Sequence, residues 1–144
     1  MAASESRTLP WLEHASPEDI NRAVEALYHV HGLMTALTDL DTLLERISEE
    51  GRAVARAEAA SVILYDEMTN ELYFRVALGD SGDQETLKRE VRLKLGQGIA
   101  GVTAQERVTI HVPDVRQDPR FYGNADQMTQ FQTRNILAVP MVER

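Results

Sequence analysis

The chain has 144 residues, of which 43% are hydrophobic and 26% are charged, and it contains no cysteine. This composition indicates one globular domain with a single core, and the lack of cysteine excludes disulfides, thiol catalysis and thiolate metal sites. The formal net charge of −8 disfavours nucleic acid as a partner, and no apolar run approaches the ~20 residues of a membrane span. Because the N-terminus also lacks the pattern of a secretory signal, we expect a cytoplasmic protein.

The first predicted elements are a flexible leader over residues 1–15 and a helix that begins at Ser16-Pro17. Apolar positions then recur at intervals of 4, 3, 4 and 3 residues, with a histidine in the series: Ile20, Val24, Leu27, His31 and Met34. This heptad-like stripe has two interpretations. The helix either packs on its own domain or pairs with a second copy to form a homodimer, with His31 at the seam.

A second helix is predicted to begin at Thr38–Asp41, with Leu40, Leu43, Leu44, Ile47 and Val54 on one face. Two strands follow, Ser61–Tyr65 and Glu71–Ala77, and the short turn Asp66–Asn70 between them predicts an antiparallel hairpin. The alternation of polar and apolar residues over Glu90–Leu95 predicts a third strand.

The basic segment Lys88–Lys94 is the best candidate for a nucleic-acid patch, but its alternation favours the solvated face of a strand. Gly96-Gln97-Gly98 predicts a sharp bend before a short helix, Ile99–Gln105. The remaining predicted elements are a strand at Val108–Val112, a loop at Pro113–Tyr122, a polar helix at Ala125–Phe131 and a strand at Ile136–Val142. The last strand is the most apolar and is expected to be central. This order predicts an α+β domain with an antiparallel sheet.

Motifs for catalysis or metal binding are absent from the sequence. The four histidines, His14, His29, His31 and His111, are scattered, and His29 and His31 point in different directions on a helix. No nucleophile elbow or Gly-Lys-Ser/Thr phosphate loop occurs. Asp114 and Asp118 form a possible carboxylate pair, but beside prolines they are expected to bond their own backbone. We therefore expect a protein that is not an enzyme and holds no metal.

Three segments, LGQGIAG (Leu95–Gly101), VPDVRQDPRFY (Val112–Tyr122) and FQTRNILAVPM (Phe131–Met141), resemble the GAF domain, a small-molecule sensor module of signalling proteins. The likeness extends upstream to Ala57–Ser61 and to Asp66–Leu72, and covers nearly the whole chain. It implies a GAF domain over residues 16–144, with a central antiparallel sheet, N-terminal helices on one face and a helix-and-loop lid on the other. The family's C-terminal strands and closing helix are missing, so we expect a fragment whose full-length protein carries an output domain downstream.

Within the family, these motifs most resemble those of the cyclic-nucleotide-binding GAF domains of phosphodiesterases and adenylyl cyclases. The resemblance therefore makes cAMP or cGMP the first candidate ligand. The resemblance implies that Ile99 and Ala100 contact the cyclic phosphate at a helix N-terminus, where free N–H groups and the helix dipole favour an anion. It places the polar contacts to base and phosphate at Ser61, Asp126, Thr129 and Thr133. Ala77 and Leu78 depart from the family, which has an aromatic–acid pair there.

The base of a nucleotide would bind in an apolar slot. The aromatic residues predicted to cover this slot are Phe121, Tyr122 and Phe131. Each site residue also has a structural interpretation: the glycines form a turn, Phe121-Tyr122 plugs the loop onto the sheet, and Asp126 is solvated or caps a helix. We predict a regulatory domain whose ligand binds beneath a lid at residues 114–133. The alternatives are a ligand-free dimerisation module, or binding of another metabolite or a haem-like group with His111 as axial ligand.

Overall fold

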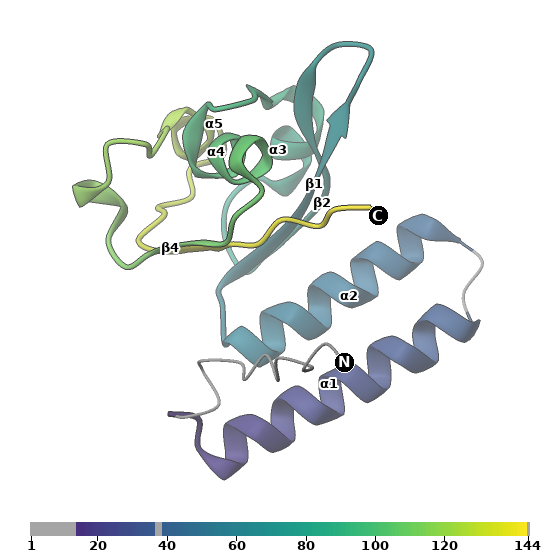
Figure 1. Ribbon diagram of the computed structural model, residues 1–144. Helices are drawn as coiled ribbons and strands as arrows, with labels where there is room; N and C mark the ends of the chain where they lie inside the picture. Colours follow the sequence, from purple (N-terminus) through teal and green to yellow (C-terminus); the bar gives the residue numbers. More distant parts are fainter. Residues whose placement is uncertain (1–13, 37–38, 144) are drawn as a thin grey trace, which may run out of the picture. The chain divides into compact units, whose positions relative to one another are not determined.

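The computed structural model describes residues 14–36 and 39–143 (Figure 1). The chain divides into two compact units, Met1–Ala57 and Glu58–Arg144. The predicted leader, at residues 1–15, lies almost entirely outside the described residues. No helix in the described part of the chain has both the length and the apolar character needed to cross a bilayer.

The first unit is a pair of helices, α1 (Pro17–Ala36) and α2 (Leu40–Ala55), as the sequence predicts. Ser16 caps α1, because its Oγ accepts a hydrogen bond from the Asp19 N–H at 3.1 Å. Asp39 caps α2 in the same way, accepting from the Thr42 N–H at 3.1 Å. Arg56, in the left-handed region at φ 51°, ends α2. The capping side chains therefore set both helix starts.

On α2 the predicted apolar face packs inward for most of its length. Leu44 is buried, and Leu43, Ile47 and Val54 are half-buried, whereas Leu40 in the first turn is exposed. The buried Ser48 satisfies its hydroxyl by donating to the Leu44 carbonyl at 2.7 Å.

The second unit begins with the predicted antiparallel hairpin. Strand β1 (Ala59–Asp66) pairs with β2 (Glu71–Gly79) from Ala59↔Gly79 to Asp66↔Glu71, with a register shift between Val62 and Ile63. A short strand, β3 (Arg92–Lys94), pairs antiparallel with β2 to complete a three-stranded sheet in the order β1-β2-β3.

Beyond the hairpin the chain forms short elements in succession, as an α+β unit: α3 (Gln84–Glu90), α4 (Gly98–Glu106), β4 (Ile110–Val112), the 3₁₀ turn η2 (Val115–Gln117), α5 (Asn124–Thr129) and β5 (Ile136–Ala138). Strands β4 and β5 form a second, two-stranded antiparallel sheet. Figure 1 shows α3, α4 and α5 grouped together beside the β1–β2 hairpin. The predicted α+β class with antiparallel sheets is confirmed.

Two predictions about secondary structure are wrong. Lys88–Glu90 belongs to the last turn of α3 rather than to a strand, and Asp83 starts that helix by accepting from the Thr86 N–H at 3.0 Å. The final strand is shorter than predicted and not central. Within the described residues β5 pairs only with β4, and the segment from Val139 to Val142 is unpaired apolar chain.

Two apolar clusters formed by described residues contribute to the core of the second unit. One is built on the buried residues Leu72, Val91 and Leu93, and is covered by Leu87 of α3, Ala100 and Ala104 of α4, and Ala125 and Met128 of α5. The other joins the buried side chains of Ile99, Ile110, Val112 and Val115. Because α4 contributes to both clusters, its position relative to the strands is fixed from two sides.

Candidate functional site

The start of α4 is shaped by backbone conformation. Gly96 and Gly98 have φ values of +81° and +68°, a region that glycine adopts without strain. The Gly96 N–H donates to the Gly101 carbonyl at 2.9 Å, which folds the bend back onto the helix. Gln97, at the N-cap, makes no side-chain cap, because its Oε1 accepts from the Lys94 N–H at 3.0 Å instead. The first turn of α4 therefore has no side chain capping its N–H groups.

The side chains of Ile99 and Ala100 are structural. Ile99 is 3% exposed in the second cluster, and Ala100 packs against the first. Only their backbone N–H groups are suited to contact a ligand. The predicted role for the two residues combines backbone and apolar contacts to a cyclic phosphate, whereas their apolar side chains pack in the core here.

The two adjacent aromatic residues Phe121 and Tyr122 lie in different environments. Phe121 is half-buried against the Ile99 cluster, which matches its interpretation as a hydrophobic plug. Tyr122 is 42% exposed, and its Cβ lies 3.3 Å from the position that a Cβ on Gly98 would occupy. Tyr122 thus stands directly beside the start of α4, where the sequence predicted part of the ligand slot.

The loop before this pair is held by two Asp-x-Arg turns. Asp114 accepts from the Arg116 N–H at 3.0 Å and Asp118 from the Arg120 N–H at 2.9 Å, so both aspartates bond their own backbone as predicted. Each also binds the arginine side chain of its turn at two oxygens. The hydrogen bonds from Arg120 hold the pKa of Asp118 at about 2.

In the predicted lid, two residues that are expected to contact a ligand, Asp126 and Thr133, hydrogen-bond to each other instead. The Asp126 carboxylate accepts from the Thr133 N–H at 2.8 Å and from the Thr133 hydroxyl at 2.6 Å. These bonds close the loop that follows α5, in which Gln130 adopts a left-handed conformation at φ 60°. We call this pair of bonds the Asp126–Thr133 latch.

The other lid candidates are also engaged within the protein. Thr129 is buried and donates its hydroxyl to the Ala125 carbonyl at 2.8 Å, a bond within α5. Phe131 packs against Gly82, where an added Cβ would come within 2.9 Å of the Phe131 Cβ. The Thr129 carbonyl accepts from the Asp83 N–H at 2.9 Å, which ties the lid to the loop before α3.

The sequence did not predict these contacts of the lid with Gly82 and Asp83. The available signal was the Asp-x-x-Thr spacing of Asp83 and Thr86, which is typical of a helix N-cap. A second missed tie is the ion pair between Arg134 and Glu58, which links the end of the lid to the start of β1.

Ser61 is placed differently from the other candidates. It lies on β1 opposite Ala77 of β2, and it is exposed to solvent. The structure therefore places Tyr122 beside the start of α4 and Asp126 against Thr133, and it leaves Ser61 exposed on β1.

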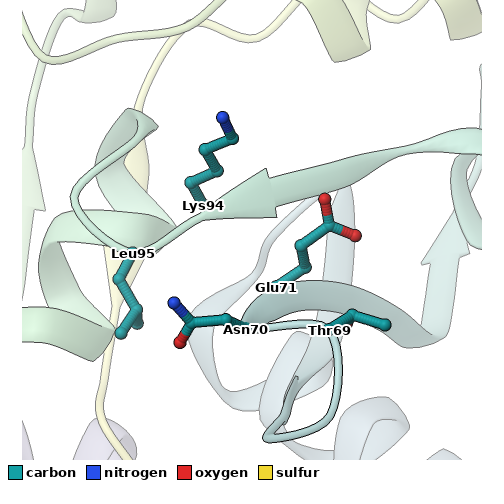
Figure 2. A pocket seen from close by; sticks show the side chains of 5 residues that line it. All are labelled: Thr69, Asn70, Glu71, Lys94 and Leu95. Atoms are coloured by element: carbon teal, nitrogen blue, oxygen red, sulfur yellow. The ribbon is translucent and has the colours of Figure 1, made fainter.

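The two best-formed hollows among the described residues include no predicted site residue. One, of about 360 Å³, lies where the β1–β2 turn meets the end of β3 and is shown in Figure 2; its lining is Thr69, Asn70, Glu71, Lys94 and Leu95. The other, of about 580 Å³, lies in the helical unit and is lined by His14, Ala15, Asp19, Arg22, Ala23 and Val54. Beneath α5, Ala125 and Met128 pack directly on the strand cluster. We call this packed arrangement of the predicted lid, residues 114–133, the closed lid.

Comparison with known proteins decides the family. Residues 39–144, most of the chain, match the model of the GAF domain. The chain belongs to the GAF domain family. This GAF domain is a regulatory, sensor-type module, and among residues 14–36 and 39–143 no group of three or more His, Asp and Glu side chains is arranged to hold a metal ion.

The relatives of this GAF domain are diverse. A probable 3′,5′-cyclic phosphodiesterase of Caenorhabditis elegans is 25% identical over 114 residues, covering 75% of this chain and 16% of that protein. The GAF domain of a phosphoenolpyruvate-protein phosphotransferase from Coxiella burnetii superposes with a TM-score of 0.75 at 18% identity, over 88% of this chain and 72% of that one. Free methionine-R-sulfoxide reductase from Neisseria meningitidis, solved with its substrate, gives a TM-score of 0.67 at 18% identity, over 90% and 70% of the two chains. These structural likenesses establish the fold.

Proposed function

We propose that this GAF domain is a regulatory module that senses a small anionic molecule, with a cyclic nucleotide as the first candidate. The observation that carries the proposal is the first turn of α4, which has no side-chain cap and stands beside Tyr122. Free N–H groups at the positive end of a helix dipole suit one phosphate charge. The C. elegans relative, a cyclic phosphodiesterase by name, supports this choice of ligand class.

The closed lid defines what ligand binding has to change. Ala125 and Met128 occupy the space against the strands, and the Asp126–Thr133 latch holds the loop after α5. Two hydrogen bonds of this kind stabilise the closed arrangement by about 1–3 kcal/mol. A ligand that takes over the Asp126 and Thr133 groups replaces these bonds, so binding shifts the population from closed to open lid. In the full-length protein this shift would reach an output domain.

Calorimetry on the intact chain tests the proposal, with cAMP and cGMP titrated separately. We expect heat of binding with at least one nucleotide, and its loss in Asp126→Ala, because this variant lacks the carboxylate. Gln127→Ala is the matched control, since Gln127 is the exposed neighbour on the same helix and is expected to leave binding unchanged. Absence of heat with both nucleotides would refute the cyclic-nucleotide proposal.

A second candidate function, homodimerisation through α1, is favoured by a separate observation. Val24, Leu27, Tyr28 and Met34 on this helix are between 58% and 77% exposed. Apolar side chains gathered on one exposed helix face are typical of an interaction surface. Except for the half-buried Ile20, the predicted stripe thus lies on an exposed face of α1, which supports the homodimer interpretation.

Sedimentation velocity tests this candidate. Wild-type chain is expected to sediment as a dimer, and Leu27→Glu as a monomer, because the substitution places a carboxylate in the apolar stripe. Met68→Glu is the control, since Met68 is an exposed methionine in the β1–β2 turn of the second unit and is not part of the α1 stripe. A wild-type monomer, or a dimer that Leu27→Glu leaves intact, would refute dimerisation through α1.

A further inference from the structure

Thr103, in the second half of α4, carries a buried hydroxyl that makes no hydrogen bond within residues 14–36 and 39–143. The residue is 5% exposed, and its Oγ1 is shielded from solvent. In the unfolded chain this hydroxyl bonds to water, and folding gives up those bonds without replacing them. Packing alone would be served better by an apolar side chain of the same shape, so the hydroxyl needs another explanation.

The other two buried hydroxyl side chains of the described residues avoid this cost by bonding to the backbone of their own helix. Ser48 in α2 donates to the Leu44 carbonyl at 2.7 Å, and Thr129 in α5 donates to the Ala125 carbonyl at 2.8 Å. Thr103 makes no such bond within α4. Its hydroxyl is therefore available to a group from outside the helix.

The position of Thr103 on α4 lies between the two apolar clusters. At one turn per 3.6 residues, it is about 40° around the helix from Ile99, which is in the second cluster, and about 60° from Ala100, which packs against the first. Side chains of a helix tilt toward its N-terminus. The hydroxyl of Thr103 is thus displaced toward the uncapped first turn of α4.

The closed lid covers the face of α4 next to Thr103. Ala100 and Ala104 of α4 pack against the same buried strand cluster as Ala125 and Met128 of α5. Opening of the lid would withdraw Met128 and free space beside the two small alanines of α4. A ligand that enters this space meets the first turn of α4 and, about 5 Å farther along the helix axis, Thr103.

We propose that Thr103 is a ligand-contacting residue of this GAF domain, and that its hydroxyl bonds a neutral polar group of the ligand when the lid is open. The inference rests on the proposed function, in which the first turn of α4 holds the anionic group. A hydroxyl both donates and accepts, so it suits another hydroxyl, an amide or a ring nitrogen.

This contact narrows the class of ligand. The geometry calls for an anion with a neutral hydrogen-bonding group about 5 Å from its charge, measured along α4. Nucleotides have such groups in the ribose and the base, whereas an inorganic phosphate ion has none and would leave Thr103 without a partner.

Three substitutions separate the hydroxyl from the rest of the side chain. Thr103→Val replaces the hydroxyl by a methyl group, and it is expected to raise the Tm of the ligand-free chain or leave it unchanged, because no hydrogen bond is lost. Thr103→Ser keeps the hydroxyl, and Thr103→Ala removes both the hydroxyl and the methyl group. Both of these are expected to lower Tm, because they leave space in the core.

Calorimetric titration of the full chain and its variants with cAMP and with cGMP measures the contact. For a nucleotide that binds the wild type, we expect the dissociation constant to rise about 3–10-fold in Thr103→Val and in Thr103→Ala. Thr103→Ser, the matched control, is expected to bind like the wild type. If Thr103 acted only through the stability of the closed lid, the Val and Ala variants would change affinity in opposite directions.

The outcomes separate this inference from the proposed function. A wild type that binds neither nucleotide overturns both. Binding that is unchanged in Thr103→Val, or that changes in opposite directions in the Val and Ala variants, overturns the contact and leaves the proposed function standing. A lower Tm of ligand-free Thr103→Val would show that the hydroxyl is already hydrogen-bonded without ligand, which also overturns the contact.

Discussion

Two glycines inside helices, Gly51 in α2 and Gly101 in α4, should respond in opposite ways to the same substitution. Replacing glycine by alanine inside a helix ordinarily stabilises it by about 0.5–1 kcal/mol, because the unfolded chain loses freedom. Around Gly51 no atom lies within 4 Å of an added Cβ, so the full gain is expected there. Around Gly101 the added Cβ would lie 2.6 Å from the Lys94 carbonyl oxygen and 3.2 Å from backbone atoms of Gly96.

The contact at Gly101 is with backbone, which cannot rotate away as a side chain can. Overpacking of this kind costs about 1–3 kcal/mol, which exceeds the helix-propensity gain. We therefore expect Gly101→Ala to destabilise the fold by about 1–2 kcal/mol and Gly51→Ala to stabilise it by up to about 1 kcal/mol. The substitution at Gly101 also pushes α4 away from the bend that positions its first turn.

Thermal unfolding followed by circular dichroism measures both effects. For units of this size each kcal/mol shifts Tm by about 4 °C, so the two variants should move in opposite directions by several degrees. If Gly101→Ala proves as stable as Gly51→Ala, the close approach of α4 to the Lys94 carbonyl does not exist, and the geometry at the start of α4 has to be revised.

Three further predictions concern the core, a helix cap and an acidic turn. Leu72 is buried at the centre of the strand cluster, so Leu72→Ala should cost about 2–5 kcal/mol in urea unfolding, and an unchanged midpoint would contradict the packing. Asp39→Ala removes the cap of α2 and should cost about 1 kcal/mol with a loss of helical signal; equal stability and helix content would show that the cap is dispensable. Because hydrogen bonds from Arg120 lower the pKa of Asp118 from 3.8 to about 2, this interaction stabilises the fold fully above pH 3.8 and is lost as the pH falls through about 2. An NMR titration should therefore show Asp118 titrating near 2 in the wild type and closer to 3.8 in Arg120→Met, and identical titrations would exclude Arg120 as the cause.

Much of the fold could be predicted because its signals are local. The caps before α1 and α2 and the turn between β1 and β2 each lie within a few residues of the element that they define. The α3 helix was missed because Lys88–Lys94 alternates like a strand, and this pattern outweighed the cap at Asp83. The length of β5 was overestimated because an apolar run from Ile136 to Val142 becomes a strand only as far as a neighbour pairs with it.

The candidate site was only partly predictable for a related reason. The bend before α4 follows from two glycines that adopt positive φ, which is a local property. That Asp126 binds Thr133 depends instead on how the loop between them turns at Gln130. The family pattern marked both side chains as polar groups of the lid, but no pattern in the sequence says that they satisfy each other when the lid is closed.

In Ile99 and Ala100 the side chains pack in the core, while the backbone N–H groups lie at the start of α4. This separation has a consequence for how a sensor of the proposed kind could diversify. Every residue except proline has a backbone N–H, so the anchoring contact of the proposed site would survive almost any exchange of one apolar residue for another of similar volume. Under the proposed function, preference for one anion over another would then be set by the exposed side chains of the lid, because Ala125 and Met128 are committed to the core beneath it.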